Sequence, residues 1–236
     1  MTKKMNKITP VFKMENGSKI GEKKLLLHGD ISADGWYGEI SLRRIRQQLE
    51  YESFDTLHVH INSNGGDVFE SIAISNYFAQ MDAEVIVHID GIAASGATII
   101  AMAADKIIMP NNTMMMVHDA STIIWGNAKQ LRKVADDLDK ISTSASKTYE
   151  TRFKGTTEEL RMLMDKEEML SADECLILGF ADEVVGEIAV DTNTDDVKQS
   201  IVNKYASAAS MANTTETKNT KQNAFQNLLK ILGKEE

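Results

Sequence analysis

The chain has 236 residues, of which 42% are hydrophobic and 26% charged, a composition typical of a soluble globular protein with one substantial core. Its formal net charge of −9 argues against a nucleic-acid-binding protein, because such a surface needs clustered basic residues. The single cysteine, Cys175, excludes an internal disulfide and a CxxC metal site, as is usual in a reducing compartment.

The sequence predicts no membrane-spanning segment. The longest apolar stretch, residues 92–104, contains Ser95 and Thr98, and it is shorter than the roughly 20 residues that cross a bilayer. Residues 3–24 lack the continuous apolar region of a secretory signal peptide. We therefore expect a cytoplasmic protein whose partners include neither a membrane nor a nucleic acid.

Strand and helix patterns alternate through the first half of the chain, from Lys24 onward. The predicted strands cover residues 24–31, 56–62 and 83–90. The predicted helices cover residues 39–51, 66–81 and 95–104. The last of the three strands is nearly all apolar, which is typical of a strand buried on both faces. This alternation indicates an α/β fold built from parallel βαβ units with right-handed crossovers.

Two more strands, at residues 105–110 and 113–119, complete the predicted core. A long helix then begins near Asn127, whose side chain is suited to cap it. Apolar residues recur at helical spacing along this helix as far as Tyr149, so one of its faces is apolar. We expect the helix either to project from the α/β core or to cover it.

Three short elements follow the long helix. Thr156 and Ser171 each begin the pattern S/T-x-x-E of a capping box, which predicts that a helix starts at each of them. Gly179 is suited to end the second helix. A strand at residues 180–185 closes the predicted fold.

These patterns divide the chain into three parts: an N-terminal segment over residues 1–23, a folded domain over 24–187 and a polar tail over 188–236. Residues 188–222 contain too few large apolar side chains to fold alone, which indicates a linker or disordered tail. The end of the tail has apolar residues at helical spacing and forms a short amphipathic segment that can dock on a partner: Phe225, Leu228, Leu229 and Leu232.

Ser95 is the first candidate for chemistry, because it stands inside an apolar run over residues 91–106. A buried hydroxyl costs a few kcal/mol unless it finds a partner, so Ser95 is either a satisfied core residue or a reactive one. At a helix N-terminus it would lie beside free backbone amides, and Gly96 would leave room for a substrate carbonyl. The turn with Gly65 and Gly66 offers further amides, and two donors from separate loops can form an oxyanion hole.

His118 is the best-placed general base among five histidines, because it follows a predicted strand at the carboxyl edge of the sheet. The other four histidines are better explained as structural residues on or inside the strands. An acid that orients the imidazole should come from a separate loop, where Asp165, Glu167 and Glu168 cluster. Spacing does not choose among the three. The residues also permit a purely structural reading, in which Ser95 is a small residue that allows close helix packing.

Three stretches, in this order, resemble the ClpP-type serine proteases: residues 61–78, 90–119 and 167–185. The resemblance implies that Ser95 is the nucleophile and His118 the general base, with the amides of Gly65 and Gly96 as oxyanion donors. It places the acid at Glu167, where the family usually has an aspartate. Neither a metal nor another cofactor is implied.

The same resemblance implies a ClpP/crotonase-type fold, a long protruding helix that interlocks between subunits, and a homo-oligomeric ring of six or seven subunits. Within the family, the chain is most similar to the head-maturation, or prohead, proteases of tailed phages. That similarity rests on residues 66–70, 105–110 and 126–141 and on the methionine-rich strand. Asn64 stands where the glycine loop commonly has a proline, which removes a φ constraint.

We therefore expect a serine endopeptidase that cleaves capsid or scaffold proteins during phage head maturation. One alternative keeps the chemistry and makes the chain a degradative subunit partnered by an ATPase. Another is a crotonase-like enzyme that acts on acyl-coenzyme A and needs no serine–histidine pair. A third is a structural capsid component with an inactive protease core.

Overall fold

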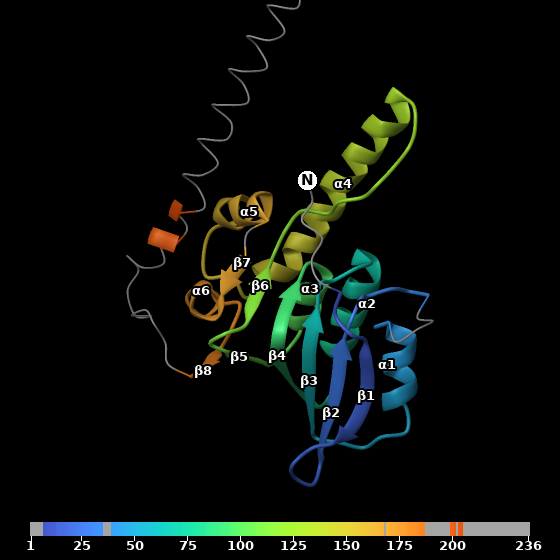
Figure 1. Cartoon of the computed structure of the whole chain (residues 1–236), viewed down its shortest axis with the longest axis vertical. Helices are drawn as coiled ribbons and strands as arrows, with labels where there is room; N and C mark the ends of the chain where they lie inside the picture. The colour runs from blue at the N-terminus through green and yellow to red at the C-terminus, as the bar shows by residue number, and fades with distance from the viewer. Residues whose placement is uncertain (1–6, 35–38, 168, 187–198, 202, 205–236) are drawn as a thin grey trace, which may run out of the picture.

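The computed structural model of the protein describes residues 7–34, 39–167, 169–186, 199–201 and 203–204 (Figure 1). The strands are β1 Val11–Asn16, β2 Glu22–His28, β3 Thr56–Ser63, β4 Glu84–Ala94, β5 Lys106–Pro110, β6 Met114–Met116, β7 Met169–Ser171 and β8 Glu183–Val185. The helices are α1 Leu42–Leu49, α2 Val68–Phe78, α3 Gly96–Ala101, α4 Ala128–Glu150, α5 Thr157–Lys166 and α6 Ala172–Leu178.

The strands form one mixed sheet in the order β1-β2-β3-β4-β5-β8. The pairs from β2 to β8 along this path are parallel, which confirms the predicted α/β fold, whereas β1 is antiparallel to β2. The long strand β4 serves two neighbours: its first half pairs with β5 and its second half pairs with β6. Strand β7 then adds to β6 in antiparallel orientation.

Side chains alternate along each strand, so the sheet has one buried face and one partly exposed face. In β3, Leu57, Val59 and Ile61 are at most 1% exposed and belong to the same core as α1 and α2. The side chains of His58 and His60 point the other way and are 23% and 18% exposed. The alternation of side chains along a strand therefore determines which residues of β3 face the core.

The prediction that residues 83–90 are buried on both faces is wrong. Val85, Val87 and Ile89 are at most 1% exposed, but Ile86 and His88 between them are only partly buried. The apolar side chain of Ile86 thus lies on the same partly exposed face as the histidines of β3. A continuous apolar run does not by itself distinguish this arrangement from full burial.

Structure also extends beyond both predicted boundaries of the domain. Strand β1 lies inside the segment that we set apart at residues 1–23, and it pairs with β2 over six residues. In the predicted tail, residues 199–201 and 203–204 are helical, and Ile201 is 9% exposed and joins the core. The amphipathic segment near Phe225 lies outside the described residues.

The long helix α4 begins as predicted, since Asn127 caps it within a complete capping box. Its first half is exposed and rises away from the sheet, whereas Ser142, Ala145, Ser146 and Tyr149 in its second half are buried (Figure 1). Capping boxes also begin α5 at Thr156 and α6 at Ser171, as predicted. Within the described ranges, no helix combines the length and the hydropathy that a membrane span requires.

Candidate active site

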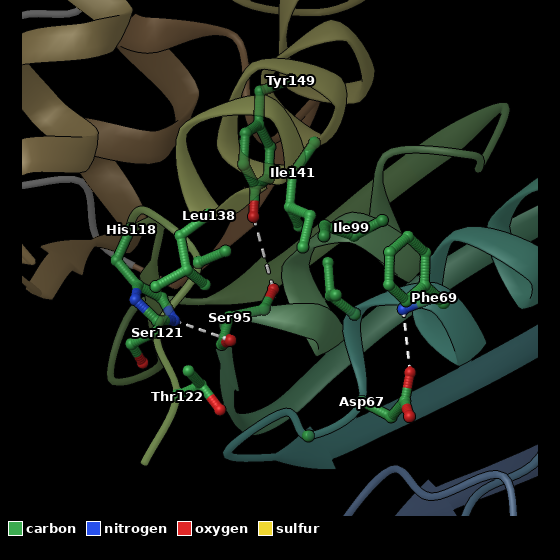
Figure 2. Close-up of a pocket in the computed structure, with 14 residues that line it drawn as sticks. Asp67, Phe69, Ser95, Ile99, His118, Ser121, Thr122, Leu138, Ile141 and Tyr149 are labelled. Carbon is green, nitrogen blue, oxygen red and sulfur yellow. Dashed lines mark hydrogen bonds between the residues drawn. The ribbon is translucent and has the colours of Figure 1, made fainter. Parts of the chain in front are cut away.

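Strand register brings Ser95 and His118 together. Strands β4 and β6 are parallel, with Ala94 paired to Met116, and the chain continues from these residues to Ser95 and to His118. Both side chains therefore emerge at the carboxyl ends of neighbouring strands. His118 Nε2 lies 2.7 Å from Ser95 Oγ, which is a short hydrogen bond (Figure 2).

The backbone of Ser95 adopts a conformation that residues other than glycine rarely take. Its φ is 57° and its ψ is −126°, and the residue caps α3 without using its side chain to do so. A non-glycine residue in such a region costs of order 1–3 kcal/mol and persists only where its surroundings hold it. Here the Ser95 N–H donates to Met116 O at 2.9 Å, and the Ser95 carbonyl accepts from Thr98 N at 2.9 Å. The hydroxyl is thus left free to meet His118.

The second imidazole nitrogen of His118 faces Glu167. Glu167 Oε1 lies 3.8 Å from His118 Nδ1, which is too long for a hydrogen bond, and the glutamate side chain is 61% exposed. Among the described residues, Nδ1 is a buried atom without a hydrogen-bond partner. Glu167 ends α5 in the left-handed conformation, with φ at 52°. The acid is therefore near the base but is not bonded to it.

The other two candidate acids do not approach His118 in the same way. Asp165 interacts with Asp119, and burial, followed by the hydrogen bond between the two carboxyl groups, raises the pKa of Asp165 above its ordinary value. Arg161 Nη1 lies 3.5 Å from Asp119 Oδ1, so this carboxyl pair has its own cationic neighbour. Glu168 lies outside the described residues. Of the described candidates, Glu167 is the one within ion-pair distance of His118.

The structure changes the predicted oxyanion donor in the glycine loop. The Gly65 N–H donates to Ser63 Oγ at 3.0 Å inside the core, so that amide is already in use. The adjacent Gly66 is exposed and lines the cavity beside Ser95. A Cβ atom at Gly66 would lie 2.0 Å from Ile31 O, so only glycine fits this turn. Gly66, rather than Gly65, therefore lines the cavity beside Ser95.

Gly96 occupies the predicted position at the start of α3. The first amides of a helix have no acceptor within the helix, and the amide of Gly96 follows directly on the nucleophile. A Cβ atom at Gly96 would lie 2.1 Å from Ser71 Oγ, so the absence of a side chain lets α3 pack closely on α2. The close approach places the start of α3 next to the glycine loop.

Ser95 and His118 line a cavity of about 340 Å³, together with three more polar side chains and a larger set of apolar ones. The further polar members are Asp67, Ser121 and Thr122. Figure 2 shows side chains from α2, α3 and α4 around it. The apolar members are Val68, Phe69, Ile99, Ala120, Leu138, Ile141, Ala145 and the ring of Tyr149. The sequence analysis assigned the α4 residues to an apolar stripe but did not predict that this stripe faces the nucleophile.

Tyr149 is a neighbour of Ser95 that the sequence analysis did not connect with the candidate site. It is 1% exposed, and its hydroxyl donates to Ser95 O at 3.4 Å (Figure 2). Burial raises the pKa of the phenol far above its ordinary value, so the group stays a neutral donor. In the described part of the chain, no three His, Cys, Asp or Glu side chains are arranged to hold a metal ion.

Comparison with known proteins identifies the family of this chain. The profile of the Clp protease family matches residues 42–188. The ATP-dependent Clp protease proteolytic subunit of Chlorella vulgaris is 29% identical over 140 residues, which cover 58% of this chain and 69% of that protein. The subunit of the same name from Deinococcus radiodurans is 27% identical over 134 residues, which cover 56% and 65%. The chain thus spans about two thirds of the length of these relatives.

The fold has a solved counterpart as well. A mutant of ClpP1 from Listeria monocytogenes superposes with a TM-score of 0.60 at 21% identity, covering 70% of this chain and 91% of the other. The architecture is therefore a ClpP-like α/β fold with a mixed sheet. Because the family profile covers more than half of its length, this chain belongs to the Clp protease family.

Proposed function

We propose that the chain is a serine endopeptidase that cleaves polypeptides through an acyl-enzyme. The observation that carries the proposal is the 2.7 Å hydrogen bond between Ser95 Oγ and His118 Nε2, two side chains that line one cavity. A serine is a poor nucleophile until a base takes its proton, and this bond supplies that base. A crotonase-like reaction on acyl-coenzyme A would not need such a pair, so the geometry favours the protease.

The reaction follows from the positions of the groups. Ser95 Oγ attacks the peptide carbonyl while His118 Nε2 takes the hydroxyl proton, and His118 then gives this proton to the leaving amine. Water hydrolyses the resulting ester in the same two steps. The amides of Gly66 and Gly96 stabilise the negative charge that develops on the carbonyl oxygen. Glu167 stabilises the imidazolium from the Nδ1 side.

The cavity indicates which substrates fit. The apolar part of its lining, which includes Phe69 at 63% exposure, suits an apolar side chain next to the scissile bond. Burying such a side chain contributes about 1.5–3 kcal/mol of binding. We expect cleavage after or near large apolar residues in an extended polypeptide.

Two biological roles use this chemistry. The first is maturation of a phage head by cleavage of capsid or scaffold proteins, which residues 66–70, 105–110 and 126–141 support through their resemblance to prohead proteases. The second is a degradative subunit partnered by an ATPase, which the names of the curated relatives support. In both roles we expect a homo-oligomeric ring in the cytoplasm, with the exposed first half of α4 between subunits.

The chemistry is tested by treating the purified protein with a fluorophosphonate and mapping the adduct by mass spectrometry. We expect one adduct, on Ser95, and none in Ser95→Ala. Ser121→Ala is the matched control, because Ser121 lines the same cavity and should not affect labelling. An adduct that persists in Ser95→Ala would contradict the proposal.

The two roles are distinguished by the conditions under which the chain becomes active. The chain is assayed alone, with a hexameric unfoldase and ATP, and co-expressed with a phage capsid protein and its scaffold. Cleavage of the capsid or scaffold protein without ATP supports head maturation. Degradation of a folded substrate only with the unfoldase and ATP supports the second role.

A further inference from the structure

Thr98 joins the two strands that carry the nucleophile and the base. Its side chain is fully buried, and Oγ1 lies 2.8 Å from Ala93 O and 2.9 Å from Met116 O. Ala93 belongs to β4 and Met116 to β6. Each of these carbonyls lies two residues before a reacting side chain, Ser95 in one case and His118 in the other.

The chemistry of the hydroxyl suits this bridge. A threonine has one O–H proton, and here two carbonyl oxygens at similar distances share it as a three-centre bond. The surroundings are buried, so the bond is electrostatically stronger than it would be in water. Met116 O also accepts the Ser95 N–H at 2.9 Å, so one carbonyl of β6 is tied twice to the turn that contains Ser95.

Strand β6 is short, so each bond at its end bears on the position of His118. The strand has three residues, which pair with Ile92–Ala94 of β4 on one side and with β7 on the other. Loss of the Thr98 proton would leave two buried carbonyls without this donor, and they would move toward other donors. A displacement of β6 would be passed to His118 two residues later.

We propose that Thr98 is a positioning residue, whose hydroxyl ties β4 to β6 and thereby holds His118 Nε2 at hydrogen-bond distance from Ser95 Oγ. This inference rests on the proposed serine-peptidase function for its kinetic consequence, but not for its geometric one. Thr98 touches neither reacting atom. It acts through the two carbonyls that precede them.

The chain offers a closely matched control. Thr113 is 3% exposed, and its Oγ1 donates to Pro110 O at 2.7 Å in the turn between β5 and β6. Thr98→Val and Thr113→Val each replace a buried hydroxyl by a methyl group of nearly the same size. Only the first change removes a link between the Ser95 turn and the His118 strand.

The kinetic test measures kcat and KM on a fluorogenic peptide and the rate of fluorophosphonate labelling of Ser95. For Thr98→Val we expect kcat and the labelling rate to fall about tenfold, because small displacements of reacting groups are costly. KM should stay within about twofold, since Thr98 does not line the cavity. Thr113→Val should retain both rates within about twofold, and Thr98→Ser, which keeps the hydroxyl, should recover most of the loss.

A structural measurement keeps the test independent of activity. Crystal structures of Thr98→Val and Thr113→Val should show the Ser95 Oγ–His118 Nε2 bond broken in the first variant and kept in the second. If the wild type proves inactive but this separation grows, the proposed function fails and the positioning role stands. If Thr98→Val keeps the bond and the rates of Thr113→Val, the positioning role is wrong. Should Thr98→Val not fold, Thr98→Cys, with its weaker donor, carries the same comparison.

Discussion

The histidines of this protein occupy two contrasting environments. His118 follows β6 and lies beside Ser95, with one ring nitrogen bonded to the hydroxyl and the other without a hydrogen bond among the described residues. The others lie together on the partly exposed face of β2, β3 and β4: His28, His58, His60 and His88. The sequence supplies the same side chain to both places, but the neighbours differ.

On the sheet face the imidazoles mainly bond to one another and to one carboxylate. His58 Nδ1 lies 3.0 Å from His88 Nε2, and the ring of His60 stacks on that of His88 with centroids 4.5 Å apart. His60 and His28 each bond to a different oxygen of Asp90, at 2.8 and 2.9 Å. This resolves the partner of His28, which the sequence did not indicate.

The difference shows what makes a histidine reactive in this fold. Burial, followed by the nearby His60 and His58, lowers the pKa of His88 from 6.5 to about 4, so this ring stays neutral near pH 7 and its bonds stay inside the network. Burial alone would raise the pKa of Asp90, but the hydrogen bonds and charges of His60 and His28 outweigh it and hold that pKa below its ordinary value. His118 instead directs a nitrogen at a hydroxyl in a cavity.

The largest effect should come from replacing His118 by glutamine, and the same change in a histidine of the sheet face is its control. His118→Gln removes the base, and we expect peptide hydrolysis to fall by about 10³-fold or more. His60→Gln changes only the sheet face, and its rate should stay within about threefold. Both rates are measured at pH 7.5 on the same peptide. Equal losses in the two variants would remove the distinction between the environments.

Acid should destabilise the protein through the sheet face, and His88 determines the direction of this pH dependence. Its pKa in the folded state is about 4, below the value of 6.5 in the unfolded chain, so between these values the unfolded chain binds the extra proton. Stability is therefore full above pH 6.5 and is lost as the pH falls toward 4. Because the ring is partly exposed, we discount the shift to a loss of about 1–2 kcal/mol.

Urea unfolding at pH 7.5 and pH 5.0 measures this loss. His88→Gln should reduce the difference in unfolding free energy between the two pH values, whatever its effect on the stability itself. His28→Gln, at the edge of the same network, is the control and should leave most of the difference. A wild type whose stability does not change over this range would contradict the assignment.

Local sequence rules predicted on which elements Ser95 and His118 lie. Ser95 at a helix start and His118 just after a strand both follow from strand–helix alternation, because parallel strands end at one edge of the sheet. The helix starts at Asn127, Thr156 and Ser171 follow from capping chemistry, which involves only neighbouring residues.

The sequence failed where tertiary contacts decide. The amide of Gly65 donates a hydrogen bond to Ser63, two residues earlier in the chain. Only the three-dimensional structure of the turn shows that Gly66 lines the cavity instead. Whether one face of β4 is exposed depends on which helices cover the sheet, and the hydrophobicity pattern of the strand does not show this. Likewise, the apolar stripe of α4 does not say that Tyr149 meets the Ser95 carbonyl.

Glu167 gives a sharper test of how far the neighbours of His118 matter. Its carboxylate is 3.8 Å from Nδ1 and 61% exposed, so solvent screens its charge. We expect Glu167→Gln to lower kcat only about three- to tenfold, far less than removal of a buried triad acid. Asp165→Asn is the control, and a larger loss there than in Glu167→Gln would make Asp165 the acid.

The smallest effect should come from Tyr149→Phe, which removes a single hydroxyl and keeps the ring and its edge-on contact with Phe180. The bond from this hydroxyl to Ser95 O is long, at 3.4 Å, so its loss should change the unfolding free energy by less than about 1 kcal/mol. Because the same carbonyl also accepts from Thr98 N, the strained turn keeps most of its support, and we expect kcat to fall about two- to fivefold. Tyr77→Phe, on α2 away from Ser95, should leave kcat unchanged. A loss in Tyr149→Phe as large as that in His118→Gln would mean that the phenol, and not the serine–histidine bond alone, maintains the reactive conformation of Ser95.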